Sequence, residues 1–420
     1  MAVQDSGPAS GAARVARARR VHLPRALRVL GPGVLAGASD NDPTTVATVA
    51  VVGSTTGYAL GWLALLVFPM LAVVQAIASR VGLVARQSLG DAVATRYGRR
   101  WSRLFLLCLL PVNLLTLAAD LKAGAGALGL LSGVDLRWFI IPLAAVALAI
   151  PVLGSYDRVR KVLEVVALGL LAYVFAAFAA KPHWGAVLHG SFVPSLHWNS
   201  EYASGALALL GTTLTGYVFV WETIEMSEES ERRTAREAQL DAVAGAFFVV
   251  VVFWFILVAT GATLGVHHVR VETAEQAASA LKPIAGAAAS AIFGSALLAS
   301  ALLVLPILAA TTAHVLGCHC GWRRSISDPP REARPFYAAM AVGLLIAAAI
   351  SFTNISTIKI LFAASIAGGV GAPASLLFLL MVARDRRTMG DGRISLGLSA
   401  SGYAVALIVT VAGGAALATS

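Results

Sequence analysis

Apolar runs of about 20 residues recur along this chain of 420 residues, from residue 32 almost to the C-terminus. A helix of ~20 apolar residues is long enough to cross the ~30 Å hydrocarbon layer of a bilayer. The runs are continuous rather than alternating, which excludes a β-barrel. Only 13% of the residues are charged, about half the share found in soluble domains. A soluble enzyme and a disordered chain are therefore excluded, and the sequence predicts an all-α polytopic membrane protein.

Eleven of these runs are predicted to form transmembrane helices. They cover residues 32–52, 60–79, 104–131, 137–153, 162–180, 203–221, 242–265, 290–316, 335–352, 358–383 and 396–417. Basic residues cluster in every second connection, namely the N-terminal tail and residues 80–103, 158–161, 232–236, 323–334 and 384–393. This positive-inside pattern predicts a multi-pass protein of a bacterial-type inner (plasma) membrane, with the N-terminus cytoplasmic and the C-terminus outside. It also accounts for the net charge of +10, so no nucleic-acid partner is expected.

Two of the predicted spans contain helix breakers in their middle. The first contains Ser39-Asp40-Asn41-Asp42-Pro43-Thr44-Thr45, and the sixth contains Gly211-Thr212-Thr213-Leu214-Thr215-Gly216. Proline removes a backbone donor and clashes with the preceding turn. Breaks in helices one and six are what two inverted five-helix repeats would give, with a substrate site between them near the midplane. The predicted organisation is a basic cytosolic tail (1–30), a first repeat (31–195), a second repeat (196–388) and an eleventh helix (389–420).

Asp42 is the strongest candidate for a functional residue. A carboxylate within the membrane is costly and usually faces a cavity, a partner or an ion path. Pro43 frees backbone carbonyls beside it, and a carboxylate with free carbonyls suits a cation. The structural alternative is that Asp42 caps a half-helix and pairs with an Arg or Lys. Asp40 points to a different face, so it either lines the entry to this site or hydrogen-bonds locally.

Hydroxyl groups cluster at both breaks. A single threonine in a helix usually bonds a carbonyl of the preceding turn. Five threonines near two breaks instead favour a site of hard oxygen ligands, which suits Mg²⁺, Ca²⁺ or Mn²⁺. Neither break contains Met or Cys, so a site for soft metals is disfavoured. The hydroxyl groups are those of Thr44, Thr45, Thr212, Thr213 and Thr215.

Several motifs resemble those of the Nramp divalent-metal transporters. In the first five spans they are Gly31-Pro32-Gly33, Asp42-Pro43-Thr44-Thr45, Gln75, Arg80-Val81-Gly82, Asp120-Leu121, and Arg160-Lys161 ahead of Glu164. In the sixth they are Gly211-Thr212-Thr213 and the segment through Trp221-Glu222. The resemblance implies a LeuT-like fold and a divalent cation, Mg²⁺ or Mn²⁺, as substrate rather than as a cofactor. A closer match is the Nramp-related magnesium transporter branch, in which helix six reads G-T-T-x-S-P-Y; here Gly216 replaces the proline.

The departures from ordinary Nramp carriers indicate a change of ion. Thr45 stands at the family's Asn position and Thr215 at its metal-binding Met position. Losing the thioether removes the ligand that favours transition metals. A roomier, oxygen-lined cavity suits Mg²⁺, which gives up its waters reluctantly. The resemblance thus implies Asp42, Thr45, Thr212 and Thr215 as the metal ligands. The prediction is uptake that prefers Mg²⁺ and also admits Mn²⁺.

Proton coupling is predicted to be weak. Tyr217 and Glu222 stand where the family has histidines, and Asp120 has lost its acidic neighbour at position 123. Asp120, Tyr217, Glu222 and Asp40 are predicted to lie on the transport path or to gate it. Two structural alternatives remain: Glu222 belongs to a solvated acidic face, and Asp120 pairs with Lys122.

Two other functions stay open from the sequence, an organic-solute (amino acid) carrier of the same architecture and a non-transporting membrane sensor. Motifs of hydrolases and of ATP-driven pumps are not found, so no enzymatic activity and no cofactor are predicted. Cys318-His319-Cys320 fits no known zinc spacing and is not predicted to bind metal. The expected partners are the divalent cation and the lipid bilayer; the sequence does not define the oligomeric state, and a monomer is compatible with it.

Overall fold

A computed structural model describes residues 41–153, 168–228, 234–267, 269–324 and 328–419. All regular structure in these ranges is helical. A membrane imposes this choice, because a helix satisfies its own backbone hydrogen bonds where no water is available. The prediction of an all-α fold is therefore confirmed for the described part of the chain.

The helices follow the predicted spans closely. Their bounds are α3 Pro43–Thr56, α4 Gly61–Ala85, α5 Leu89–Tyr97, α6 Arg99–Ser132, α7 Arg137–Val152, η1 Leu168–Leu171, α9 Ala172–Ala179, α10 Trp184–Phe192, α11 Ser200–Thr213, α12 Gly216–Glu228, α13 Ala235–Thr260, η2 Gly261–Gly265, α14 Ala274–Ser279, α15 Lys282–Ala285, η3 Gly286–Ala288, α16 Ala289–Cys320, α17 Arg334–Ser351, α18 Thr357–Arg384, α19 Arg386–Met389, η4 Gly390–Gly392 and α20 Leu396–Thr419.

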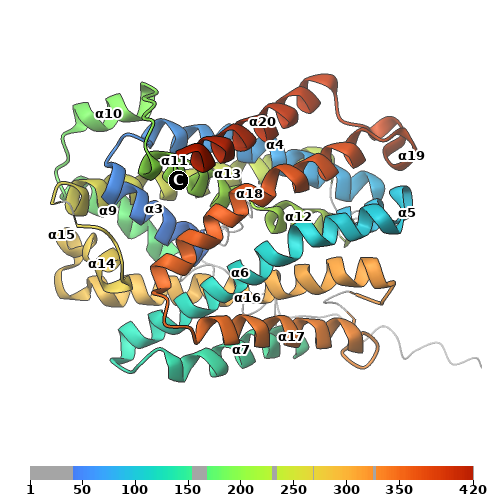
Figure 1. Ribbon diagram of the computed structural model, residues 1–420, viewed down its shortest axis with the longest axis horizontal. Coiled ribbons are helices and arrows are strands. Elements are labelled where there is room, and N and C mark those ends of the chain that lie inside the picture. The colour runs from blue at the N-terminus through green and yellow to red at the C-terminus, as the bar shows by residue number, and fades with distance from the viewer. Residues whose placement is uncertain (1–40, 154–167, 229–233, 268, 325–327, 420) are drawn as a thin grey trace, which may run out of the picture. The chain divides into compact units, whose positions relative to one another are not determined.

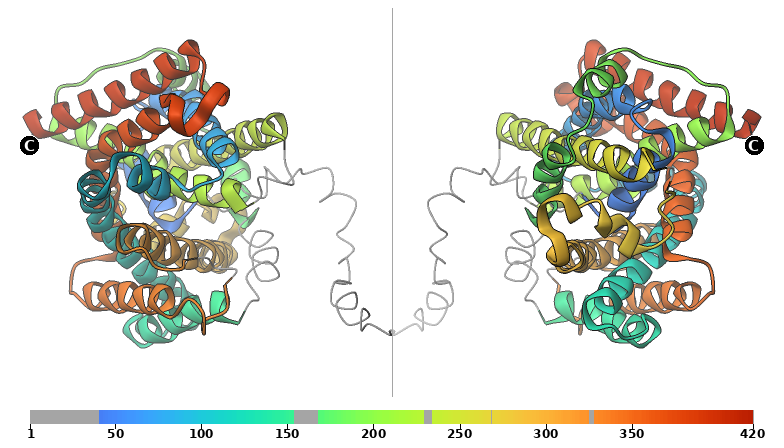
Figure 2. Two further views of the ribbon diagram at one scale, coloured as in Figure 1. Left: turned by 90° about the vertical axis from the view of Figure 1, so that its right-hand side faces the viewer. Right: turned by 90° about the vertical axis from the view of Figure 1, so that its left-hand side faces the viewer.

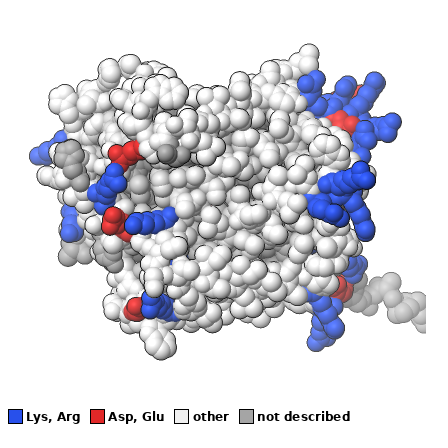
Figure 3. Space-filling model, in the orientation of Figure 1, with Lys and Arg blue, Asp and Glu red and all other residues white. Residues whose placement is uncertain are grey.

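Eight helical segments among the described residues are long and apolar enough to cross a membrane. The helices α3, α7 and η1–α9 are shorter, and part of the predicted first and fifth spans lies outside the described residues. A count of eleven therefore stays a prediction. Lys and Arg side chains gather toward the two ends of the helices, and a broad uncharged band lies between them (Figure 3).

The helices differ greatly in burial. In the most apolar 18-residue stretch of α11 and α12, 83% is buried by other parts of the protein. In the corresponding stretch of α20, only 22% is buried. In α3, the residues from Pro43 to Ala50 are all buried. Figure 2 shows α7 and α17 at one edge of the helix array and α20 at the opposite edge, with α3 between them. The described parts of the two spans with predicted breaks are thus covered mainly by other helices.

Close backbone contact fixes the end of α11 against α18. A methyl group added at Gly211 would lie 2.0 Å from the carbonyl oxygen of Ser365 and 2.3 Å from the amide nitrogen of Gly369. Only glycine fits at such a distance. This contact holds the predicted break in the sixth span beside the middle of α18 (Figure 1).

Arginine-rich segments that are far apart in sequence lie at the same end of the helices. Arg96 of α5 pairs with Asp385 at 2.9 Å, and Arg80 Nε donates to the carbonyl of Gly392 at 2.8 Å. Figure 1 shows α5 and α19 together at this end. At the other end, Arg137 donates to Asn354 at 2.7 Å. The grouping agrees with the alternation on which the predicted orientation rests.

Candidate substrate site between α3 and the α11–α12 break

The sixth span is broken where the sequence predicts. Helix α11 ends at Thr213 and α12 begins at Gly216, so Leu214 and Thr215 lie between two half-helices. The amide of Leu214 still bonds the carbonyl of Leu210 at 2.9 Å, which closes the last turn of α11. The hydroxyl of Thr215 is buried and has no hydrogen-bond partner in the described structure. The break thus offers an unused oxygen at its centre.

The start of α3 is organised by Asp42. Its Oδ1 accepts a 2.6 Å hydrogen bond from the amide of Thr45, and Pro43 occupies the first turn, where no amide donor is needed. Asp42 is 1% exposed. It therefore caps the start of α3, which is the first part of the structural alternative. However, none of the ion pairs between described residues involves Asp42. Asp40 lies outside the described residues.

Two hydrogen bonds join the start of α3 to the break in the sixth span. Tyr217 Oη donates to Asp42 Oδ2 at 2.7 Å, and the hydroxyls of Thr45 and Thr212 lie 2.9 Å apart. All four residues are buried. The structure thus brings together three of the four predicted metal ligands and one predicted gating residue, although they lie up to 175 positions apart in sequence.

A second carboxylate lies close to the same helix start. Asp120 of α6 accepts hydrogen bonds through Oδ1 from the amide of Thr44 at 3.0 Å and from its hydroxyl at 2.6 Å. Its Oδ2 is buried and has no hydrogen-bond partner among the described residues. Lys122 does not pair with Asp120, because its ammonium donates to the carbonyls of Thr353 and Ile355 at 2.6 and 2.7 Å. The predicted Asp120–Lys122 alternative is therefore wrong.

A family model described as natural resistance-associated macrophage protein-like (Nramp) matches residues 33–419. The chain belongs to the Nramp family. A divalent metal cation transporter MntH of Aeromonas hydrophila is 26% identical over 87% of this chain and 89% of its own length. The family resemblance inferred from the sequence motifs is thus confirmed.

Solved structures support the fold. A manganese transporter of Eremococcus coleocola superposes with a TM-score of 0.67 at 18% identity, covering 94% of this chain and 88% of its own. Mhp1, a transporter of the nucleobase–cation symport-1 family, gives a TM-score of 0.60 at 14% identity, over 92% of this chain and 89% of its own. These similarities concern the fold alone.

Glu222 lies further along α12 than the Asp42 group. Its carboxylate accepts a hydrogen bond from the hydroxyl of Ser79 in α4. The contact joins α12 to α4, so Glu222 has a partner on another helix in addition to any solvent that it meets. Thr213 follows the ordinary behaviour of a helical threonine, because its hydroxyl donates to the carbonyl of Leu209 at 3.1 Å.

Two serines that sequence analysis missed hold the start of α3 from other helices. Ser300 of α16 donates to the carbonyl of Asn41 at 2.6 Å, and Ser365 of α18 lies 2.6 Å from the hydroxyl of Thr48. Both are buried in long apolar helices. Their only signal in the sequence is a hydroxyl in an otherwise apolar run, which many structural serines share.

Proposed function

We propose that this Nramp protein carries divalent metal cations across the membrane and that Mg²⁺ is its preferred substrate, with Mn²⁺ also carried. The observation that carries the proposal is the contact between the start of α3 and the break between α11 and α12, which meet at Asp42. This buried carboxylate is bonded by Tyr217 and by the amide of Thr45, and it has no cationic partner in the described structure. A divalent cation is the natural counter-charge for such a group.

The ligands proposed for the ion are the Asp42 carboxylate, the hydroxyls of Thr45 and Thr215, and the Thr212 backbone carbonyl, directly or through water. Each offers a hard oxygen, and the hydroxyl of Thr215 has no other partner in the described residues. Mg²⁺ and Mn²⁺ prefer oxygen ligands, and Mg²⁺ usually keeps several of its waters. The relative from Aeromonas hydrophila is named a divalent metal cation transporter. We infer the same class of substrate for this chain, and the absence of a thioether favours Mg²⁺ within it.

We infer that the membrane potential alone drives uptake. Moving one charge through 100 mV releases ~2.3 kcal/mol, so a divalent ion gains about 7 kcal/mol at about 150 mV. That energy corresponds to roughly five decades of accumulation. The Asp42 carboxylate is engaged by Tyr217, where the family has a histidine, and Asp120 has Ala123 in place of an acidic neighbour. Fewer groups therefore remain to carry a coupled proton.

Alternating access is proposed to follow from two inverted repeats, residues 31–195 and 196–388, with the half-helices α3 and α12 rocking around the ion. The protein would lie in the plasma membrane of a bacterial-type cell, with the N-terminus in the cytoplasm and the C-terminus outside. The arginine-rich segments that share one end of the helices support this orientation.

The test is Mg²⁺ and Mn²⁺ uptake into liposomes under an inside-negative potential. Asp42→Asn, which keeps the size of the side chain, is expected to abolish uptake, whereas the exposed Asp391→Asn serves as the matched control. Uptake retained by Asp42→Asn overturns the assignment of the site. Proton influx in fixed ratio to metal flux overturns the uncoupled mechanism. Amino acid flux without metal flux would favour an organic-solute carrier, and no flux would favour a sensor.

A further inference from the structure

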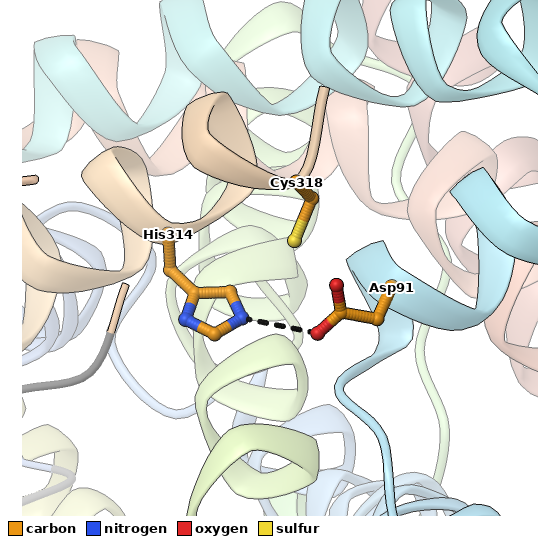
Figure 4. Close-up of side chains that lie close together, drawn as sticks. All are labelled: Asp91, His314 and Cys318. Atoms are coloured by element: carbon orange, nitrogen blue, oxygen red, sulfur yellow. Dashed lines mark ion pairs between the residues drawn. The ribbon is translucent and has the colours of Figure 1, made fainter. Parts of the chain in front are cut away.

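A second group of possible metal ligands lies away from the Asp42 site. It consists of Asp91 of α5 together with His314 and Cys318 of α16 (Figure 4). His314 and Cys318 are four residues apart, so they project from the same face of their helix. Asp91 reaches them from the short helix that follows α4. The group lies at the end of the helices where α5 and the C-terminus of α16 meet the arginine-rich segments (Figure 1).

The distances within this group are close to those of a metal site. One ligand atom from each residue can be chosen so that all three lie within 4.8 Å of one another. His314 Nε2 and Asp91 Oδ2 are 3.7 Å apart. Ligands of a tetrahedral zinc ion, at bond lengths of ~2.0 to 2.3 Å, lie roughly 3.3 to 3.8 Å from each other. Adjustments of about 1 Å or less would therefore complete the site.

The hydroxyl of Ser88 marks the point on which the three side chains converge. Its Oγ lies 2.8 Å from Asp91 Oδ2, 3.0 Å from His314 Nε2 and 3.8 Å from Cys318 Sγ. Three potential ligands thus share one small polar partner in a buried position. A cation would replace the hydroxyl as their common partner, and Ser88 would remain beside it as a further oxygen.

Arg324 orients the carboxylate of this group. Its guanidinium pairs with Asp91 Oδ1, which leaves Oδ2 directed toward His314. The Arg324 side chain is only 21% exposed, so its guanidinium is incompletely hydrated and relies on Asp91 as its partner. Because a thiol loses its proton when it binds metal, Cys318 would supply one negative charge, and the charge of Asp91 would be shared between the ion and Arg324.

We propose that Asp91, His314 and Cys318 form a second cation site, selective for ions that accept nitrogen and sulfur ligands, such as Zn²⁺ and Co²⁺. Imidazole and thiolate suit these ions and are poor ligands for Mg²⁺. The second site would therefore respond to a class of ion that the proposed oxygen-lined substrate site does not prefer.

Occupancy of this site is expected to slow transport, an effect that rests on the proposed function. The amide of Leu89, at the start of α5, donates to the hydroxyl of Thr223 in α12 at 2.9 Å. A cation that binds α5 to α16 would thereby hold α12, the half-helix that follows the break. Movement of α12 is what alternating access requires in the proposed mechanism.

Titration of the purified full-length protein with Co²⁺ tests the binding. Thiolate coordination gives a near-ultraviolet charge-transfer band, which is expected to saturate at one Co²⁺ per chain. Cys318→Ser is expected to remove the band, and His314→Gln to weaken binding by about 100-fold or more, since even changes beyond the direct ligands cost ~10 to 100-fold. The matched controls are the exposed Cys320→Ser and its neighbour His319→Gln, which should leave the titration unchanged.

Each contrary result has a defined meaning. The site is overturned if the wild type shows no thiolate band or if the band survives Cys318→Ser. It is also overturned if Cys320→Ser loses the band, because the thiolate ligand would then be Cys320. Asp42→Asn should keep the band, so the proposal stands or fails independently of the substrate site. Thermal denaturation of each variant, with Cys318→Ala as a second thiol-free variant, excludes loss of the fold as the cause.

Mg²⁺ uptake into liposomes with Zn²⁺ on both sides tests the effect on transport. Zn²⁺ is expected to slow uptake by the wild type at least severalfold and to have little effect on Cys318→Ser. Equal inhibition of both proteins would place Zn²⁺ at the substrate site instead. It would contradict the proposal that Zn²⁺ slows transport by binding to the second site.

Discussion

The groups around Asp42 and around Asp91 differ in the atoms that they offer and in how they are assembled. The Asp42 group offers only oxygen atoms and is built where the start of α3 meets the break between α11 and α12, among buried residues. The Asp91 group combines oxygen, nitrogen and sulfur and lies where a short helix meets the end of α16. Ligand type therefore separates the two groups more clearly than charge does, because each holds few acidic residues.

The largest expected effect comes from a larger side chain at Gly211, where α11 and α18 are in close contact. Gly211→Ala places a methyl group 2.0 Å from the carbonyl of Ser365, so α11 and α18 must separate. Overpacking of this kind costs about 3 kcal/mol, and we expect poor folding together with loss of transport. Gly414→Ala is the control, since nothing lies within 4 Å of a methyl group there. Normal melting and transport in Gly211→Ala would contradict the packing of the break.

The next largest effect is a change of ion preference at the Asp42 group. Thr215→Met introduces a thioether at an oxygen that has no partner in the described structure. Soft ligands favour transition metals over alkaline earths, so the ratio of Mn²⁺ to Mg²⁺ uptake should rise about tenfold or more. Competition assays in liposomes measure this ratio, and Thr213→Met, on a residue whose hydroxyl bonds Leu209, is the control. An unchanged ratio would remove Thr215 from the site.

A smaller effect is expected when the contact between α12 and the start of α3 is weakened. Tyr217→Phe removes the 2.7 Å hydrogen bond to Asp42 and leaves the ring in place. A hydrogen bond to a charged group contributes about 1.5 to 3 kcal/mol, so the apparent Mg²⁺ affinity should change by about tenfold, measured by the concentration dependence of uptake. An unaltered affinity would show that this bond does not shape the substrate site.

The smallest effect concerns the ion pair between Arg96 of α5 and Asp385. Burial by itself raises the pKa of Asp385, but hydrogen bonds from Arg96 and Thr388, with the charge of Arg96, lower it below its ordinary value. Asp385 therefore stabilises the fold above the ordinary aspartate pKa of about 4, and this stability is lost as pH falls through the lowered pKa. The melting temperature of Asp385→Asn should be slightly below that of the wild type from pH 8 to 5, and the difference should vanish in stronger acid. A difference that grows in acid would contradict this sign.

The sequence predicted features that depend on local chemistry. Continuous apolar runs located the helices, and Gly211 and Gly216 located the break in the sixth span, because these signals act on the backbone of their own segment. Asp42 is a candidate for a similar reason, since a carboxylate within an apolar run requires a partner.

Contacts between distant helices could not be predicted in this way. The bonds from Ser300 and Ser365 to α3 depend on how α16 and α18 pack. Lys122 lies two residues from Asp120, yet it bonds carbonyls of the α17–α18 connection, because successive helical side chains point in different directions. His314 and Cys318 show a four-residue spacing in the sequence, but only the fold brings Asp91 to them.

Calorimetric titration of the purified protein with Mg²⁺ tests the role of Asp42 most directly, since it measures binding without relying on transport. Wild-type protein is expected to bind one Mg²⁺ per chain, Asp42→Asn should give no measurable binding heat, and Asp391→Asn should match the wild type. Equal Mg²⁺ binding by the wild type and Asp42→Asn would contradict the assignment of the cation to this carboxylate.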